Sequence, residues 1–153
     1  DIAISMRLDP RRRYLLDLLA RFQTRTMTGV IEAAITEEAK KVNLGGKSLY
    51  DRLEELWAGE EAERLARLAL FARLELRTEE DAIWEVVLKT PGFWREGSAR
   101  SSMDDLRLEV LLRHWQALKK HVEEHGSGGP FPLSETPQVT FDEDFPFGNF
   151  KGD

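Results

Sequence analysis

The stretch Ile2-Ala3-Ile4-Ser5-Met6-Arg7-Leu8-Asp9-Pro10 decides the fold of this chain. Along it, apolar residues alternate with small or polar residues, which is the two-residue period of a β-strand. One face of that strand carries Ile2, Ile4, Met6 and Leu8, and the other carries Asp1, Ala3, Ser5 and Arg7. A strand this short is not stable alone. Because no second strand is evident in the long sequence that follows, we expect it to pair with the same segment of a second copy of the chain.

Two helices are predicted directly after the strand. Asp9 is a suitable N-cap and Pro10 suits the first helical position, while Thr26 gives a second start signal after the break at residues 23–25. Apolar residues recur at helical spacing after each start: Leu15, Leu18, Leu19 and Phe22, then Met27, Val30, Ile31, Ala34 and Ile35. Each helix therefore has one apolar face to bury against the other and against the paired strands.

The order of strand, helix and helix resembles the ribbon-helix-helix DNA-binding proteins. The resemblance lies in residues 4–10 and in Arg25-Thr26-Met27-Thr28-Gly29-Val30-Ile31, and it covers residues 2–42. It implies that residues 1–43 form a DNA-binding and dimerisation domain. In that family two chains pair their strands into an antiparallel ribbon, which lies in the major groove of double-stranded DNA.

The resemblance also implies roles for individual residues. Ala3, Ser5 and Arg7 would face the bases, and Arg7 could grip a guanine edge for about 1–3 kcal/mol of discrimination. Phosphates would be held at the start of the second helix and by nearby cations: Thr26, Met27, Thr28, Arg11, Arg12 and Arg25. The dimer core would consist of Ile4, Met6, Leu8, Leu15, Leu19, Val30, Ile31 and Ala34.

The chain departs from the family pattern between the two helices. That turn usually carries a glycine, but Gln23, Thr24 and Arg25 occupy it here, so we expect one of them to adopt an unfavourable backbone conformation. Gly29 stands early in the second helix, where it costs stability. The chain begins at Asp1 without a methionine, which leaves room for a natural N-terminal arm ahead of it.

Charge separates the first residues from the rest. Residues 1–48 hold nine lysines and arginines against six acidic residues, a net charge of +3, and since the whole chain carries −6, the remainder carries −9. A basic segment ahead of an acidic one suits a DNA-binding head attached to a body with another role. A solvated charge run, or a dimerisation module that touches no DNA, is the alternative interpretation.

Length and composition set the class of protein. With 153 residues, 41% of them hydrophobic, the chain can fold as one ordinary domain or two small ones. It has no cysteine, which excludes disulfides and thiolate metal sites and fits a reducing cytoplasm. No apolar run is long enough to span a bilayer, so we expect a cytoplasmic, nucleoid-associated protein without a membrane partner.

Residues 44–125 are predicted to form a helical bundle, which makes the fold mainly α. Residues 43–47, with Gly45-Gly46, look like a linker, and Ser48 can cap the next helix. Thr78 and Asp81 mark a later helix that ends at Thr90-Pro91-Gly92 and turns Ile83, Val86 and Val87 inward. The last helix is predicted from near Ser102 to about His125, with an apolar seam at Leu108, Leu111, Trp115, Leu118 and Val122.

No enzymatic motif is present, so an enzyme is not expected. The sequence lacks a nucleophile elbow, a phosphate loop and a dinucleotide fingerprint. His121 and His125, with Glu124, could share a metal, but they lack the zinc-protease order and a further ligand, and surface histidines explain them better. We expect no metal and no cofactor. We expect His114 to serve packing, and Trp57, Trp84 and Trp94 to be core or interface residues.

Residues 126–153 read as an irregular acidic-aromatic tail. Phe141, Phe145, Phe147 and Phe150 surround Asp142-Glu143-Asp144 among prolines and glycines. Such a tail could capture a protein partner, dock on the body or compete with DNA for the basic head.

These features together predict a homodimeric transcriptional regulator, a repressor of bacterial type, whose dimers can assemble further along an operator. An antitoxin is the first alternative, because such proteins join the same head to a C-terminal part that binds a toxin. A plasmid or phage accessory protein that organises a nucleoprotein complex is the second, and an adaptor without DNA binding is the third.

Overall fold

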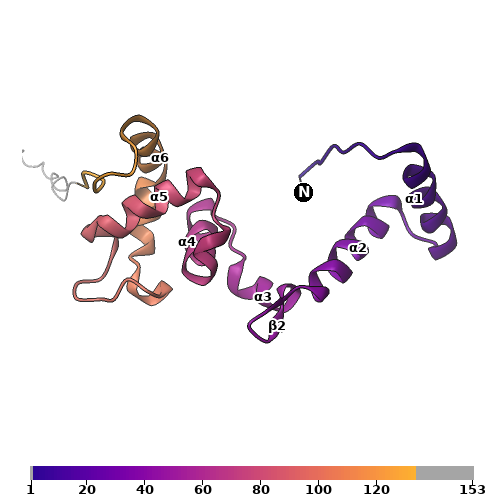
Figure 1. Ribbon diagram of the computed structural model, residues 1–153, viewed down its shortest axis with the longest axis horizontal. Coiled ribbons are helices and arrows are strands. Elements are labelled where there is room, and N and C mark those ends of the chain that lie inside the picture. The colour runs from indigo at the N-terminus through magenta and orange to yellow at the C-terminus, as the bar shows by residue number, and fades with distance from the viewer. Residues whose placement is uncertain (1, 134–153) are drawn as a thin grey trace, which may run out of the picture. The chain divides into compact units, whose positions relative to one another are not determined.

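The computed structural model describes residues 2–133, and in this range the chain is mainly α-helical (Figure 1). Residues 2–133 contain six α-helices and one two-stranded antiparallel sheet, and the chain divides into two compact units between Glu55 and Leu56. The predicted mainly-α class is confirmed. None of the described helices is both long and apolar enough to cross a membrane.

The first unit is built on two helices, α1 (Pro10–Gln23) and α2 (Met27–Lys41). The Asp9 carboxylate accepts hydrogen bonds from the amides of Arg11 and Arg12, both at 3.0 Å, and so caps α1 as predicted. Thr26 Oγ1 accepts a 2.9 Å hydrogen bond from the amide of Gly29 and caps α2, which is also as predicted. Both starts are set by side chains that satisfy amides left free at a helix end.

The turn between α1 and α2 holds the strain that the sequence predicts. Thr24 adopts the left-handed conformation, with φ 53° and ψ 49°. The amides of Thr24 and Arg25 donate to the carbonyls of Arg21 and Ala20, at 3.2 and 2.9 Å. These two bonds close α1 and turn the chain into α2.

Residues 2–9 lie outside any helix or strand in the single chain. A strand needs a hydrogen-bonded neighbour, and no other described part of the chain pairs with this segment. The predicted pairing with a second copy therefore stays a prediction.

The predicted linker after α2 is wrong, because these residues form a tight hairpin. Strand β1 (Asn43–Leu44) pairs with β2 (Lys47–Ser48), Asn43 opposite Ser48 and Leu44 opposite Lys47. Gly45 and Gly46 have φ values of +64° and +89°, which a two-residue hairpin turn requires. Helix α3 (Leu49–Leu56) follows at once, and Ser48 caps it as predicted, because its Oγ accepts from the amide of Asp51 at 3.1 Å.

The second unit packs α4 (Glu61–Ala72), α5 (Thr78–Lys89) and α6 (Leu108–His125), with short 3₁₀ turns at Arg73–Glu75, Pro91–Phe93 and Met103–Asp105. Thr78 is the first residue of α5 and not its cap. There the Glu80 carboxylate accepts a 2.9 Å hydrogen bond from the amide of Arg77 instead. The helix ends before Pro91, as predicted.

Helix α6 starts later than predicted and ends where predicted. Residues 103–105 form a 3₁₀ turn, and Leu106 then makes a β-bridge with Trp94, so the α-helix begins only at Leu108. Gly126, with φ +75°, ends it.

The core of the second unit is aromatic and aliphatic. Trp84 and Trp94 meet edge to face at 5.8 Å, and the Trp94 Nε1 hydrogen is donated to the Val87 carbonyl at 2.8 Å. Other fully buried side chains are Ala66, Val86, Val87, Phe93, Leu111 and Leu118. Thus Val86, Val87 and the centre of the α6 seam face inward as predicted, whereas Ile83, Leu108 and Val122 are half-buried at the edge of the core. Trp57, expected in the core or at an interface, is not in the core: it is exposed beside the Arg64 guanidinium.

Candidate dimer and nucleic-acid interface

An apolar groove of about 680 Å³ runs over the first unit. Seven of the eight residues predicted for the dimer core line it: Met6, Leu8, Leu15, Leu19, Val30, Ile31 and Ala34. Ile4 does not line the groove and is 79% exposed. The structure therefore brings most of the predicted core side chains together on one surface.

This surface is uncovered in the single chain. Met6 and Leu15 are each 54% exposed, and only Val30 among the predicted core residues is buried, at 7%. Fully burying such a side chain is worth about 1.5–3 kcal/mol. An apolar surface of this extent on a small unit is typical of an interface with another chain.

Sequence reasoning missed several residues of this groove. Leu16, Ala39, Val42 and Leu49 line it as well, together with Ile35, which helical spacing had already placed on the apolar face of the second helix. Extending that spacing to the end of α2 would have found Ala39 and Val42.

The residues predicted to face bases lie on the N-terminal segment. Ala3, Ser5 and Arg7 are all exposed, and the Arg7 side chain has no hydrogen bond or ion pair with any described residue. The Arg7 guanidinium is therefore available to a ligand, as direct reading of a base requires.

The start of α2 presents free amides. Thr26 Oγ1 satisfies the amide of Gly29, and the Thr26 carbonyl accepts from the amide of Val30. Within residues 2–133, the amides of Met27 and Thr28 have no acceptor. An anion can take up such amides, and the helix dipole favours negative charge at this end.

The cations predicted to hold phosphates differ in their partners. Arg12 forms a 2.6 Å ion pair with Asp9, whereas the side chains of Arg11 and Arg25 pair with no described residue. Hydrogen bonds from the Arg12 amide and guanidinium lower the pKa of Asp9 below its ordinary value. The Arg12 ion pair is exposed, so a phosphate could displace the carboxylate at little cost.

Two histidines of the second unit, His114 and His121, pack against Phe131. The His114 and His121 rings lie edge-on to Phe131, at 6.1 and 5.5 Å, and the rings of His121 and His125 are 4.8 Å apart. In the described part of the chain, no three His, Cys, Asp or Glu side chains gather as a metal site would require. Phe141, Phe145, Phe147 and Phe150, predicted to bind a partner, lie outside the described residues.

No protein-family model matches this chain, and neither the curated proteins nor the solved structures contain a match to it.

Proposed function

We propose that the chain is a homodimeric, sequence-specific DNA-binding transcriptional regulator. In the dimer, residues 2–8 of two copies pair into an antiparallel ribbon that enters the major groove. The open apolar groove carries this proposal, because an alternating segment and two amphipathic helices leave the same set of side chains uncovered. A second copy of that surface would cover the groove, which is the self-complementary arrangement of a two-fold dimer.

Charge and exposure support DNA as the ligand of this dimer. Arg7 would point from the ribbon to the bases, while the amides of Met27 and Thr28 and the free cations Arg11 and Arg25 would hold the backbone. Each of these groups occurs twice in a dimer. The number of phosphate contacts then predicts a steep salt dependence of binding.

The test is binding of the full chain to duplex DNA from the region upstream of its own coding sequence, compared with random duplex, over a salt series. We expect tight and selective binding whose affinity falls steeply as salt rises. Absence of binding to either duplex at low salt would contradict the proposal and leave the first unit as a dimerisation module.

Arg7→Ala locates the base contact in the same assay. We expect it to weaken binding to the upstream duplex by about 1–3 kcal/mol and binding to random duplex much less. Lys41→Ala is the matched control, since it removes an exposed cation at the far end of α2. An equal loss on both duplexes would make Arg7 a phosphate contact.

A further inference from the structure

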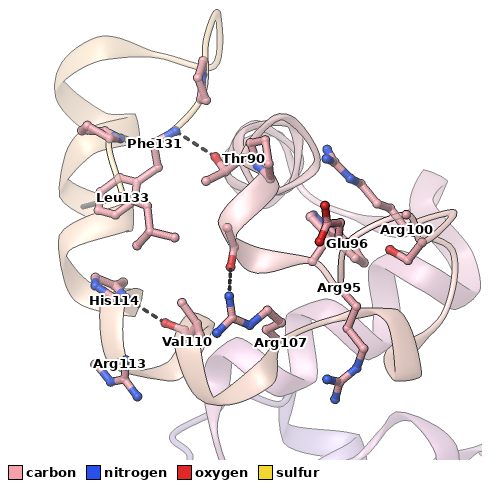
Figure 2. Close-up of a pocket in the computed structure, with 17 residues that line it drawn as sticks. Thr90, Arg95, Glu96, Arg100, Arg107, Val110, Arg113, His114, Phe131 and Leu133 are labelled. Atoms are coloured by element: carbon pink, nitrogen blue, oxygen red, sulfur yellow. Dashed lines mark hydrogen bonds between the residues drawn. The ribbon is translucent and has the colours of Figure 1, made fainter. Parts of the chain in front are cut away.

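A hollow in the second unit is rich in arginine (Figure 2). Its volume is about 1130 Å³. We call it the arginine pocket, after the four arginines that line it: Arg95, Arg100, Arg107 and Arg113. Among the described residues, Glu96 is the only carboxylate in the lining. The pocket is thus strongly positive although the chain beyond residue 48 carries a net charge of −9.

No carboxylate among the described residues neutralises these arginines. Arg95 Nε donates to the Asp104 carbonyl at 2.8 Å, Arg107 donates to the Gly92 carbonyl at 3.4 Å, and Arg100 donates to the Leu88 carbonyl. Arg113 has no hydrogen bond or ion pair with a described residue. Each guanidinium therefore keeps donors for a further ligand.

Arg73, in the same unit, is paired with carboxylates, unlike the arginines of the pocket. Arg73 bridges Asp81 and Glu85, at 2.7 and 2.6 Å, so both of its carboxylate partners come from α5. Charge-assisted pairs of this kind are the strong hydrogen bonds of proteins. The arginine pocket lacks such pairs, which indicates an anionic ligand that the described residues do not supply.

The last described residues of the chain, 130–133, line this pocket. The amide of Phe131 donates to Thr90 Oγ1 at 2.8 Å, and the Phe131 ring stacks on Phe93 at 6.1 Å. Leu133 packs over Gly92, where a Cβ atom would come within 2.3 Å of Leu133 Cδ2. In Figure 2, Phe131 and Leu133 lie along α6, and Arg107 lies between them and Arg95. The last described residues thus form one wall of the pocket.

The twenty residues that follow Leu133 have the complementary charge. They contain five acidic residues and one lysine, a net charge of −4, and three of the acids are consecutive at Asp142-Glu143-Asp144. Asp142 stands nine residues after Leu133, and a fully extended chain covers about 3.3–3.6 Å per residue, so its reach is about 30 Å. That reach exceeds the width of a cavity of this volume.

We propose that the segment 141–145, Phe-Asp-Glu-Asp-Phe, docks in the arginine pocket of its own chain. The three carboxylates pair with the free guanidinium donors, and the flanking phenylalanines contact the apolar wall of Pro91, Phe131 and Leu133. Because the tether is short, the effective concentration of the segment at the pocket is in the millimolar range. A free anion of equal intrinsic affinity would have to exceed about that concentration to displace the segment. This inference does not depend on the proposed DNA binding.

The test uses a nitroxide spin label and the amide NMR signals of the full chain. Because the chain has no cysteine, Asn149→Cys gives a single labelling site. We expect the label to broaden the signals of Gly97, Arg100 and His114, which line the pocket, more strongly than those of Glu79 and Lys120, which do not. Equal signals with and without the label at the pocket residues would overturn the proposal, as would broadening confined to α1 and α2.

Charge exchange tests whether the carboxylates and the arginines meet. Asp142→Lys/Glu143→Lys/Asp144→Lys should strongly reduce the broadening at the pocket, and so should Arg107→Glu/Arg113→Glu, whose two side chains are exposed. Combining the two sets should restore it. Arg77→Glu/Lys120→Glu, an equal change of charge outside the pocket, should leave it intact. Broadening that either reversal leaves undiminished would show that charge does not hold the segment there.

A mixed sample shows whether the segment docks on its own chain or on a second copy. Isotope-labelled chain without the nitroxide is mixed with unlabelled chain that carries it. We expect no broadening at the pocket in this mixture, and broadening there would place the segment in the pocket of the other copy and overturn the proposal as stated.

Discussion

Thr24 shows how one residue sets the geometry of the first unit. Its left-handed conformation costs a residue with a Cβ atom about 1–2 kcal/mol relative to the right-handed region, and a β-branched side chain is especially poor there. The missing glycine in the turn predicts strain at residues 23–25. Which of the three residues carries it depends on how α1 ends, and the sequence alone does not determine that.

Thr24→Gly should therefore stabilise the protein. We expect the free energy of unfolding of the first unit to rise by about 1 kcal/mol, because glycine adopts positive φ without a steric penalty. The measurement is chemical denaturation followed by circular dichroism. Ala33→Gly is the matched control and should lower stability by about 1 kcal/mol, since it places glycine inside α2. A loss of stability in Thr24→Gly would contradict the left-handed turn.

The helices were predicted well because their signals are local. Asp9, Thr26 and Ser48 cap α1, α2 and α3 as their positions in the sequence predict. The hairpin at residues 43–48 was missed because strands of two residues are too short to show a period. The start of α6 was placed too early because the bridge between Trp94 and Leu106 is a contact between distant residues.

Seven of the eight residues predicted for the dimer core line the groove over α1 and α2, but the second copy that would cover the groove stays a prediction. Helical spacing selects the face that α1 and α2 share, so Leu15, Leu19, Val30 and Ile31 meet as expected. Pairing of residues 2–8 requires a second chain, and a single chain contains no partner for the segment.

Met6→Asp tests the burial of that face. In a dimer the substitution would place a charge in the shared core, so we expect dissociation together with unfolding of the first unit. Sedimentation and circular dichroism measure the two effects. Ala3→Asp puts the same charge on the opposite face of the segment and should leave the dimer intact. A folded monomer of Met6→Asp would contradict the shared core.

Glu61 joins α4 to α6 in the second unit. Its Oε1 accepts from Lys119 Nζ at 2.9 Å and from Trp115 Nε1 at 3.1 Å. These bonds, the one from Lys119 first, lower the pKa of the Glu61 carboxyl. A lowered pKa means that the stabilisation is complete above the pKa of the unfolded chain and is lost as the pH falls through the folded value.

Glu61→Gln should weaken that pH dependence. We expect the variant to be less stable than the natural chain at neutral pH and to approach it as the pH becomes acidic. Denaturation midpoints over a pH series measure this. Glu79→Gln, an exposed residue in the first turn of α5, is the control and should keep the natural profile. Parallel profiles for the natural chain and Glu61→Gln would contradict the carboxylate link.

At the scale of the whole molecule, the first 48 residues are basic and the remainder of the chain is acidic. Residues 1–48 carry +3 and the remainder −9, of which residues 134–153 contribute −4. Residues 131–133 pack against the core of the second unit, so a truncation that spares the fold must begin after Leu133.

Deletion of residues 134–153 should leave DNA affinity unchanged or raise it. The deleted segment is acidic and repels phosphates, so its loss removes an unfavourable term. Titration of upstream duplex DNA with the two proteins at equal salt gives the comparison. A sharp fall in affinity would mean that the segment helps to hold DNA.

The ribbon is the centre of this account, and its register can be tested by single cysteines in a chain that has none. If residues 2–8 of two copies pair antiparallel along their whole length, Ser5 faces Ser5 of the second copy and Ala3 faces Arg7. Paired residues are close enough for a disulfide, whereas the two Ala3 positions are about 14 Å apart.

The decisive measurement is the yield of disulfide-linked dimer after mild oxidation of each variant. We predict a high yield for Ser5→Cys, a low yield for Ala3→Cys or Arg7→Cys alone, and a high yield when those two are mixed. Gly46→Cys in the hairpin gives the background. If Ser5→Cys and the mixture do not exceed that background, the strands do not pair and the ribbon is wrong.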